Sequence, residues 1–220
     1  MILAAGRGER MRPLTDRTPK PLLPVAGKPL IVWHLERLAR AGIRDLVINH
    51  EHLGDQIEAL LDDGSAWGVA IRYSVEPHGA LETAGGIANA LPLLGGAPFL
   101  VVNGDIWCDL DFAALPNLAE RDLAHLVLVP NPPHHADGDF ALENGRVRGV
   151  PPRLTFSGVG VYRPDLFAAI ERGQRARLAP ILRAAMDDDR VSGQIHNGRW
   201  VDVGTPERLA ALDEEVRGHL

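Results

Sequence analysis

The sequence is poor in cysteine, and Cys108 is the single one in 220 residues. One cysteine excludes an intramolecular disulfide and a clustered zinc site. A catalytic thiol needs a neighbouring base to activate it, and the residues around Cys108 in the sequence offer none. We therefore expect an inert, partly buried thiol.

Long apolar segments are also missing. No apolar run approaches the roughly 18 residues that a helix needs to span a bilayer. The N-terminal residues MILAAGRGER turn glycine-rich and basic too early for a signal peptide. We therefore expect a cytoplasmic protein that has no membrane partner.

The chain as a whole has no excess of positive charge. Its net charge is −6 and its pI is about 5.8, which argues against general nucleic-acid binding. Residues 7–20 are the exception, because five basic side chains there outnumber two acidic ones and give a local charge of +3. Such a loop fits a small polyanionic ligand, since it concentrates its field over a short range. A solvated basic loop would have the same composition.

The first half of the chain alternates predicted strands and helices. Apolar runs predict strands at 1–4, 45–49, 69–74 and 99–102, and helical spacing predicts helices at 30–41, 53–61 and 84–91. This alternation is typical of an α/β fold with a doubly wound, mostly parallel mixed sheet flanked by helices. The length of 220 residues fits a single domain, 1–220.

The second half is richer in predicted strands. They lie at 125–129, 140–142, 146–148, 154–162, 191–196 and 199–203. The Asn-Gly pairs at 144–145 and 197–198 predict two hairpin turns. Thr205 and Pro206 predict the N-cap and the first position of a final helix.

The first predicted strand runs into a loop of small residues, Leu3-Ala4-Ala5-Gly6-Arg7-Gly8. Small residues allow backbone N–H groups to approach a phosphate closely. A third glycine does not follow, which excludes the Rossmann dinucleotide motif of an oxidoreductase, and no Gly-Lys-Ser/Thr occurs, which excludes a Walker A loop. Arg10 and Lys20 follow instead, and two prolines stiffen the backbone around Lys20.

The run L-A-A-G-x-G-x-R-M-x-P-L-T, followed by P-K-P, resembles the signature of the sugar-1-phosphate nucleotidyltransferases. The resemblance implies that the loop backbone wraps a nucleoside triphosphate, through Leu3, Ala4, Ala5, Gly6 and Gly8. It also implies that Arg10 and Lys20 are catalytic and hold the transferred phosphate and the leaving pyrophosphate. The substrates would be small molecules, with residues 1–110 as the nucleotide-binding half and 111–220 as the sugar-binding half. The chain would act as a monomer or a small homo-oligomer.

The segment 77–86, PHGALETAGG, leads into a predicted helix whose N-terminal N–H groups are available to an acceptor. It is similar to the family segment that contacts base and ribose, which implies nucleotide contacts for Glu82, Thr83 and Gly85. An ionised Glu82 can only accept hydrogen bonds, so it suits uracil or guanine better than cytosine. The same carboxylate could simply favour the helix dipole.

Two aspartates end predicted strands, Asp105 in V-V-N-G-D and Asp202 in W-V-D-V-G-T-P. Taken singly, each could be a turn residue. Ligands of open α/β sheets bind beyond the carboxyl ends of strands, and Mg²⁺ usually needs one or two carboxylates together with substrate phosphates. The resemblance implies that Asp105 and Asp202 hold the Mg²⁺ cofactor and that Asn103 contacts the nucleotide.

Two segments are the candidates for sugar binding, Gly-Asp-Phe at 138–140 and Thr-Phe-Ser-Gly at 155–158. They resemble segments that line the sugar pocket of the family, which implies sugar contacts for Asp139, Ser157 and Gly158. The Gly-Asp pair is also an ordinary turn. The histidines at 134–135 have no second half at metal-ligand spacing, so we expect a polar loop there.

Within the family, the segments NGD, LETxGG, HHxxGDF, LTFSG and WVDVGT are similar to uridylyltransferases that act on N-acetylmuramate α-1-phosphate in peptidoglycan recycling. A mannose- or heptose-1-phosphate guanylyltransferase is the alternative. A non-catalytic regulator that binds nucleotide sugars is a third possibility, although the joint presence of Arg10, Lys20, Asp105 and Asp202 argues against it. N-Acetylmuramate carries a lactyl carboxylate, and Arg146, Arg148 and Arg153 are the cations near the sugar segments in sequence.

Overall fold

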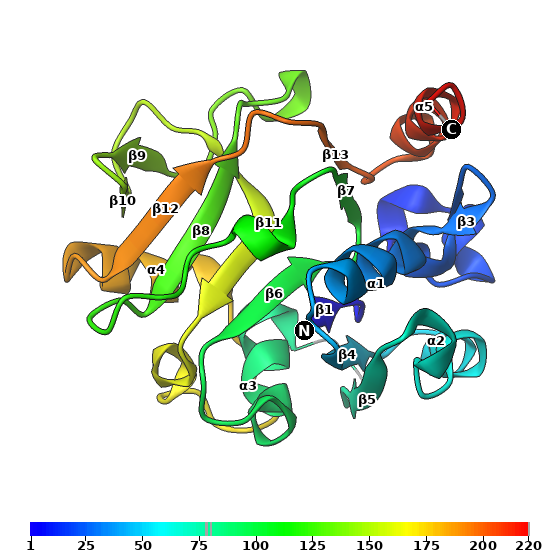
Figure 1. The fold of residues 1–220 in the computed structure, drawn as a ribbon, viewed down its shortest axis with the longest axis horizontal. Helices are drawn as coiled ribbons and strands as arrows, with labels where there is room; N and C mark the ends of the chain where they lie inside the picture. Colours follow the sequence, from blue (N-terminus) through cyan, green and yellow to red (C-terminus); the bar gives the residue numbers. More distant parts are fainter. Residues whose placement is uncertain (78, 80, 220) are drawn as a thin grey trace. The chain divides into compact units, whose positions relative to one another are not determined.

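The computed structural model describes residues 1–77, 79 and 81–219. His78 and Ala80, which belong to the predicted base-binding segment, lie outside the described residues. The chain forms two compact units, shown as one ribbon in Figure 1. The first unit comprises Met1–Ala80, Asn103–Leu115 and Arg199–Leu220, and the second comprises Leu81–Val102 and Pro116–Gly198. Both units are discontinuous in sequence, whereas the predicted halves are contiguous.

The first unit contains a parallel arrangement of three strands. The order is β5-β4-β1, and both pairs are parallel. The strands are β1 (Ile2–Leu3), β4 (Asp45–His50) and β5 (Ala70–Val75). Helix α1 (Leu30–Arg40) precedes β4, and helix α2 (Gly54–Leu61) follows it. These elements confirm the strands and helices predicted for residues 1–74. The strand predicted at 45–49 is buried as expected, because the apolar side chains at its centre, Leu46, Val47 and Ile48, are all buried.

Two short antiparallel pairs complete the first unit. They join β7 (Ile106–Cys108) to β13 (Trp200–Asp202), and β2 (Pro24–Val25) to β3 (Lys28–Pro29). The final helix α5 (Pro206–Arg217) packs against β2. One apolar cluster unites these segments, and it is made of Met11, Leu23, Val25, Leu30, Trp107, Val203, Leu209, Leu212 and Val216. The N-terminal loop, β7 and the C-terminal helix therefore share one core.

The second unit is built mainly from antiparallel pairs. Its strand order is β6-β11-β8-β12-β10-β9. Among the strand pairs of this unit that the described residues form, only the β8–β12 pair is parallel. The strands are β6 (Phe99–Asn103), β8 (Ala124–Val129), β9 (Ala141–Glu143), β10 (Arg146–Arg148), β11 (Thr155–Tyr162) and β12 (Val191–Ile195), and the helices are α3 (Glu82–Leu94) and α4 (Leu178–Asp187). The predicted α/β class, with a mixed sheet flanked by helices, is confirmed. Parallel pairing characterises the first unit and antiparallel pairing the second.

The two Asn-Gly pairs have different outcomes. Asn144 and Gly145 both have positive φ angles, 50° and 76°, and join β9 to β10 as the predicted hairpin. The hairpin predicted at Asn197-Gly198 is wrong. Strand β12 pairs with β8 and β10, whereas β13 pairs with β7 in the first unit. The second Asn-Gly pair therefore lies where the chain passes from one unit to the other.

None of the described helices is both long enough and apolar enough to cross a membrane.

Candidate active site

Hydrogen bonds from neighbouring segments hold the loop after β1 in place. The backbone N–H of Ala4 donates to Asn49 Oδ1 at 3.0 Å, and Asn49 Nδ2 donates to Glu76 Oε1 at 2.6 Å. The Leu3 carbonyl accepts the N–H of Gly104 at 2.8 Å. These contacts use the Leu3 carbonyl and the Ala4 N–H to fix the path of the chain. Sequence reasoning missed Asn49 and Glu76, which are buried polar residues.

The two loop glycines differ in what they require. Gly8 has a φ of 62°, and a Cβ atom there would lie 2.9 Å from Thr15 Cγ2 and 3.3 Å from Lys20 Cβ. Gly6 is exposed, and no protein atom lies within 4 Å of the position of its Cβ. Gly8 is therefore needed for the close packing of the loop, and Gly6 borders open space. Ala5 between β1 and these glycines is buried.

Lys20 and Asp105 meet although 85 residues separate them. Lys20 begins the 3₁₀ helix Lys20–Leu22 and is only 7% exposed, and its Nζ donates to Asp105 Oδ2 at 2.7 Å. Arg10 lies in the 3₁₀ helix Glu9–Met11, where its side chain is exposed while Met11 is in the core. The sequence predicted that Arg10, Lys20 and Asp105 belong to one site. Of these three residues, Lys20 and Asp105 are in contact in the structure.

The two predicted metal-binding aspartates lie at the same end of the β7–β13 pair, because Asp105 immediately precedes β7 and Asp202 is the last residue of β13. Asp202 lies opposite Ile106 in the β7–β13 pair, and the Val203 N–H donates to the Asp105 carbonyl at 3.0 Å. Arg208 Nη1 donates to Asp202 Oδ2 at 2.9 Å. Each carboxylate therefore has a cationic side chain on it, Lys20 on one and Arg208 on the other. Carboxylate oxygens are the hard ligands that Mg²⁺ prefers. Among the described residues, no group of three or more His, Cys, Asp or Glu could hold a metal ion by itself.

His34 supports the strand that follows Asp105. Its Nε2 lies 2.8 Å from the Ile106 carbonyl, while its buried Nδ1 has no hydrogen-bond partner among the described residues. Burial lowers the pKa of His34 to about 4, an effect that Arg37 reinforces and Asp105 opposes. The imidazole is therefore neutral at pH 7 and donates from Nε2. Sequence reasoning missed this residue, because a lone histidine in a helix carries no signal.

Cys108 at the end of β7 is free and buried, as expected. Burial raises the pKa of its thiol. The group is therefore a protonated thiol at neutral pH, which fits the predicted inert role.

In the second unit, the start of α3 is occupied by another part of the chain. The N–H groups of Ala84 and Gly85 both donate to the Ala176 carbonyl, at 3.0 and 3.1 Å. A Cβ atom on Gly85 would lie 2.4 Å from the Gln174 carbonyl oxygen. The prediction that the N–H groups of this helix start are available to an acceptor is therefore wrong for these two, because the segment 174–177 lies across it.

Glu82 is held by two arginines. It begins α3 with a φ of 58°, and its carboxylate oxygens lie 2.9 Å from Arg175 Nη2 and 3.1 Å from Arg177 Nε. Both arginine side chains are largely exposed, and Thr83 beside Glu82 is partly buried. Sequence reasoning missed these arginines, since nothing in the pattern links residues 175 and 177 to residue 82.

The predicted sugar residues have structural partners within the second unit. Asp139 Oδ2 accepts the N–H of Phe156 at 2.8 Å, and Asp139 Oδ1 lies 3.2 Å from His135 Nε2. Ser157 is buried, donates to the Val127 carbonyl at 2.7 Å and accepts the N–H of Val159 at 3.1 Å. Gly158 has a φ of 80° and lies where the register of β11 against β8 shifts. Ser157 and Gly158 are buried, whereas the Asp139 side chain is partly exposed.

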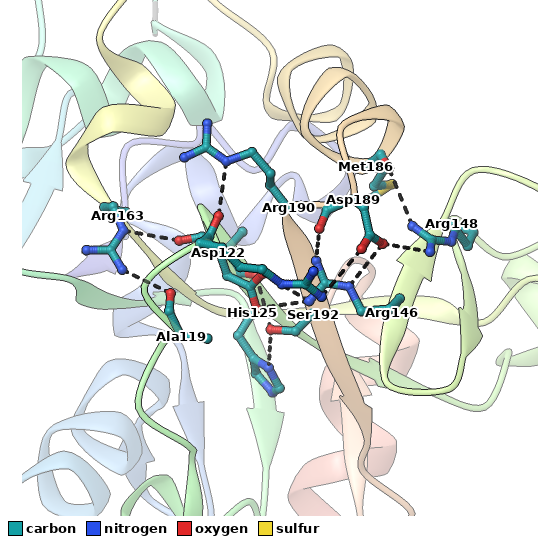
Figure 2. Close-up of polar contacts among 12 residues, drawn as sticks. Ala119, Asp122, His125, Arg146, Arg148, Arg163, Met186, Asp189, Arg190 and Ser192 are labelled. Atoms are coloured by element: carbon teal, nitrogen blue, oxygen red, sulfur yellow. Dashed lines mark hydrogen bonds and ion pairs between the residues drawn. The ribbon is translucent and has the colours of Figure 1, made fainter.

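Two of the three arginines near the sugar segments are committed elsewhere. Figure 2 shows Arg146 and Arg148 directed at Asp189, with Arg146 also directed at Asp122. Arg146 Nη1 donates to both oxygens of Asp122, at 2.9 and 3.0 Å. Arg153 Nη2 donates to the Gly149 carbonyl at 3.1 Å. Arg146 and Arg148 are therefore paired with carboxylates of the protein itself and do not offer a free cation to a substrate carboxylate.

Residues 1–142 match the family model described as "Nucleotidyl transferase", and these residues contain the loop, Lys20, Glu82 and Asp105. The chain belongs to the nucleotidyl transferase family. It is a nucleotidyltransferase, as the N-terminal motif predicted.

Curated relatives cover nearly the whole of this nucleotidyltransferase. It is 64% identical to the N-acetylmuramate α-1-phosphate uridylyltransferase of Neisseria meningitidis serogroup B, over 95% of this chain and 94% of that protein. It is 39% identical to the protein of the same name from Caulobacter vibrioides, over 98% of this chain and 96% of that one. The predicted family is therefore confirmed.

The fold has solved counterparts. A Bacillus anthracis protein described as a glucose-1-phosphate thymidylyltransferase, solved in complex with sucrose, superposes with a TM-score of 0.83. The match covers 98% of this chain and 94% of that one at 23% identity. At that identity the likeness concerns the fold alone.

Proposed function

We propose that this nucleotidyltransferase transfers a uridylyl group from UTP to N-acetylmuramate α-1-phosphate, giving UDP-N-acetylmuramate and pyrophosphate. The observation that carries the reaction is the Lys20–Asp105 contact at a strand end, with Asp202 on the adjacent strand. The substrate assignment rests on the name and 64% identity of the Neisseria relative. The product is a cell-wall sugar nucleotide, so we place the enzyme in the cytoplasm and in peptidoglycan recycling.

The reaction would be an in-line attack by the sugar phosphate oxygen on the α-phosphorus of the triphosphate. The nucleophile is already an anion, so no side chain has to act as general base. The difficulty is to bring two polyanions together, and Lys20 and Arg10 would lower that barrier by neutralising the transferred phosphate and the leaving pyrophosphate. The buried stem of Lys20 limits where its ammonium can point.

Asp105 and Asp202 would hold Mg²⁺. When bound, the ion would neutralise phosphate charge and orient the reacting groups. Lys20, which lies on Asp105 in the structure, would then be available to the phosphates. The backbone of the loop after β1, with Gly6 at its exposed point, would enclose the triphosphate, and Asn103 would contact the nucleotide.

Glu82 would select the base. Arg175 and Arg177 lie on its carboxylate, which therefore has a defined orientation at the start of α3. An ionised carboxylate accepts the imide N–H of uracil or the N1–H of guanine, and it offers nothing to the unprotonated N3 of cytosine. Thr83 would add a nucleotide contact, whereas the N–H of Gly85 is used by the Ala176 carbonyl. Asp139, Ser157 and Gly158 would line the sugar side.

The alternative substrate pair is GTP with mannose 1-phosphate. Glu82 permits guanine, and the chain is 31% identical to a mannose-1-phosphate guanylyltransferase of Mycobacterium tuberculosis, over 100% of this chain and 67% of that one.

A screen of pyrophosphate release distinguishes the two. UTP, GTP, CTP and dTTP would each be tested with the 1-phosphates of N-acetylmuramate, N-acetylglucosamine, mannose and heptose, in the presence of Mg²⁺. We expect the highest kcat/KM for UTP with N-acetylmuramate α-1-phosphate. A clear preference for GTP with mannose 1-phosphate would overturn the assignment and support the alternative.

A further inference from the structure

Arg208 is a residue of the first unit that the proposed reaction does not use directly. It lies in the first turn of α5, and its Nη1 donates to Asp202 Oδ2 at 2.9 Å. The side chains of Arg208 and Asp202 are 20% and 26% exposed, so the pair is largely shielded from water. We infer that Arg208 is a positioning residue that orients Asp202 for the metal site, an inference that rests on the proposed function.

The helix start that carries Arg208 is fixed locally. Thr205 is the N-cap of α5, and its Oγ1 accepts the backbone N–H of Arg208 at 3.4 Å. Pro206 occupies the first helical position, where its fixed φ suits a helix. The backbone of Arg208 is thus tied to a turn that begins three residues after Asp202. The reach of the guanidinium is set by the same turn.

A cation in the first turn of a helix is unfavourable, because the N-terminal end of the helix dipole is positive. Glu207, beside Arg208, is the type of residue that this position favours. The carboxylate of Asp202 compensates the Arg208 charge. The pair therefore accounts for an arginine at a position where the helix alone disfavours one.

Gly204 leaves room for this pair. A Cβ atom on Gly204 would lie 2.2 Å from Arg208 Nη2 and 3.0 Å from Asp202 Oδ1. Gly204 is buried, and its φ is not among the positive values of the chain. The requirement for glycine is therefore one of space. Any side chain here would displace the guanidinium from Asp202.

The contact has a direct consequence for a cation ligand. By bonding Oδ2, Arg208 fixes the rotation of the carboxylate about its Cβ–Cγ bond and hence the direction of Oδ1. Partners of this kind orient metal ligands, and losing one typically costs about 10–100-fold in metal affinity or activity. A guanidinium that acted only through its charge would have the opposite effect, since it would repel the metal. The sign of the change in affinity therefore separates the two roles.

The test measures metal affinity without turnover. Mn²⁺ is titrated into the full-length protein with UTP and no sugar 1-phosphate, and binding is followed by water-proton relaxation. We expect Arg208→Met to bind Mn²⁺ about 10–100-fold more weakly than the wild type, and Arg208→Lys to recover part of the loss. Arg217→Met is the matched control, because Arg217 lies on the same helix and pairs with an aspartate, Asp213, outside the site. It should bind Mn²⁺ like the wild type.

Gly204→Ala tests the same contact with the arginine in place. It should weaken Mn²⁺ binding in the same direction, because its Cβ atom would lie against both Arg208 Nη2 and Asp202 Oδ1. This second variant keeps the test decisive if Arg208→Met fails to fold.

Two outcomes overturn the inference in distinguishable ways. If Asp202→Asn weakens Mn²⁺ binding while Arg208→Met and Gly204→Ala bind as well as or better than the wild type, Arg208 does not position Asp202, and the proposed metal site stands. If Asp202→Asn itself binds Mn²⁺ like the wild type, Asp202 is not a metal ligand. The metal site of the proposed function and the role of Arg208 then both fail.

Discussion

The two units use the same residue types, aspartate with arginine or lysine, in contrasting ways. In the first unit, Lys20 meets Asp105 and Arg208 meets Asp202, with one cation for each carboxylate at the ends of neighbouring strands. In the second unit, Arg146 bridges Asp122 and Asp189, and Arg148 adds a further pair with Asp189 (Figure 2). Arg121 also pairs with both aspartates. The Asp105 side chain is 41% exposed and the Asp122 side chain only 3%.

The difference lies in what each carboxylate has left to offer. A partly exposed carboxylate at a strand end can exchange a side-chain cation for a ligand. A buried carboxylate with both oxygens on one guanidinium is committed to the fold, and removing its partner leaves an uncompensated charge. Charged residue types alone therefore do not separate a site from a structural cluster. Exposure and the position along the strand do.

The largest effect is expected at the contact between Lys20 and Asp105. Lys20→Ala or Asp105→Ala should fold normally and lose roughly 10²–10³-fold in turnover, as for the removal of other preorganised charge stabilisers. Lys28→Ala is the matched control, because Lys28 also pairs with a carboxylate, Glu36, at 2.6 Å but lies outside the site. Steady-state pyrophosphate release measures the effect. Retention of more than about a tenth of wild-type turnover in either site variant would contradict the assignment, taking such losses as at least 10²-fold.

The second unit should respond in stability instead. Asp122→Ala leaves Arg146 largely buried without one of its partners, so the free energy of unfolding should fall by about 3–5 kcal/mol. Urea denaturation measures this, and turnover per folded molecule should be unchanged. Asp16→Ala, which breaks an exposed pair with Arg12, should cost less than about 1 kcal/mol. Equal costs for the two variants would mean that the cluster does not stabilise the unit.

A smaller effect, on the pH dependence of stability, is expected from two buried histidines, His34 in the first unit and His125 in the second. Burial lowers the pKa of both. The unfolded chain therefore binds more protons than the folded one as pH falls, and stability is full above the unfolded pKa of about 6.5 and is lost as pH falls toward the folded value. For His34, with a folded pKa of about 4, the loss between pH 7 and pH 5 should be about 2 kcal/mol.

His34→Gln should flatten this pH dependence more than His125→Gln. Both ring nitrogens of His125 have partners, Ser192 and Gln194, whereas His34 Nδ1 has none in the part of the chain that the structure describes. Urea midpoints at pH 5, 6 and 7 provide the measurement. A wild-type profile that His34→Gln leaves unchanged would show that His34 is not the group that titrates.

The smallest expected effect is at Cys108. The thiol is buried and its pKa is raised by burial, so Ellman's reagent should leave it unmodified in the folded protein at pH 8. Denaturation should release one reactive thiol per chain. Rapid modification of the folded protein would show that β7 opens on the timescale of the assay, in contrast to a firmly packed core.

Much of the local structure followed from the sequence. Apolar runs and helical spacing predicted β4, β5, α1 and α2 to within a residue or two, and Thr205 and Pro206 predicted the start of α5. Helix α4 received no prediction, although Leu178, Leu182, Ala185 and Met186 are its buried face at helical spacing. The N-terminal motif indicated the family, which the comparisons confirmed.

Pairing between distant segments was beyond the sequence. The Asn-Gly signal at 197–198 has the right local chemistry for a hairpin, yet β13 pairs with β7, because the partner of a strand is chosen by the core it shares and not by the turn before it. The contacts of Lys20 with Asp105, Glu82 with Arg175, and Arg208 with Asp202 depend likewise on packing.

The sequence by itself determined the loop of small residues, the spacing of Arg10 and Lys20 after it, and the two aspartates at strand ends, because these are properties of a few adjacent residues. Only the tertiary structure decided which cation lies on which carboxylate and which arginines are committed to the fold. Those pairings join residues up to 95 positions apart, and burial in a shared core is what brings them within hydrogen-bond distance.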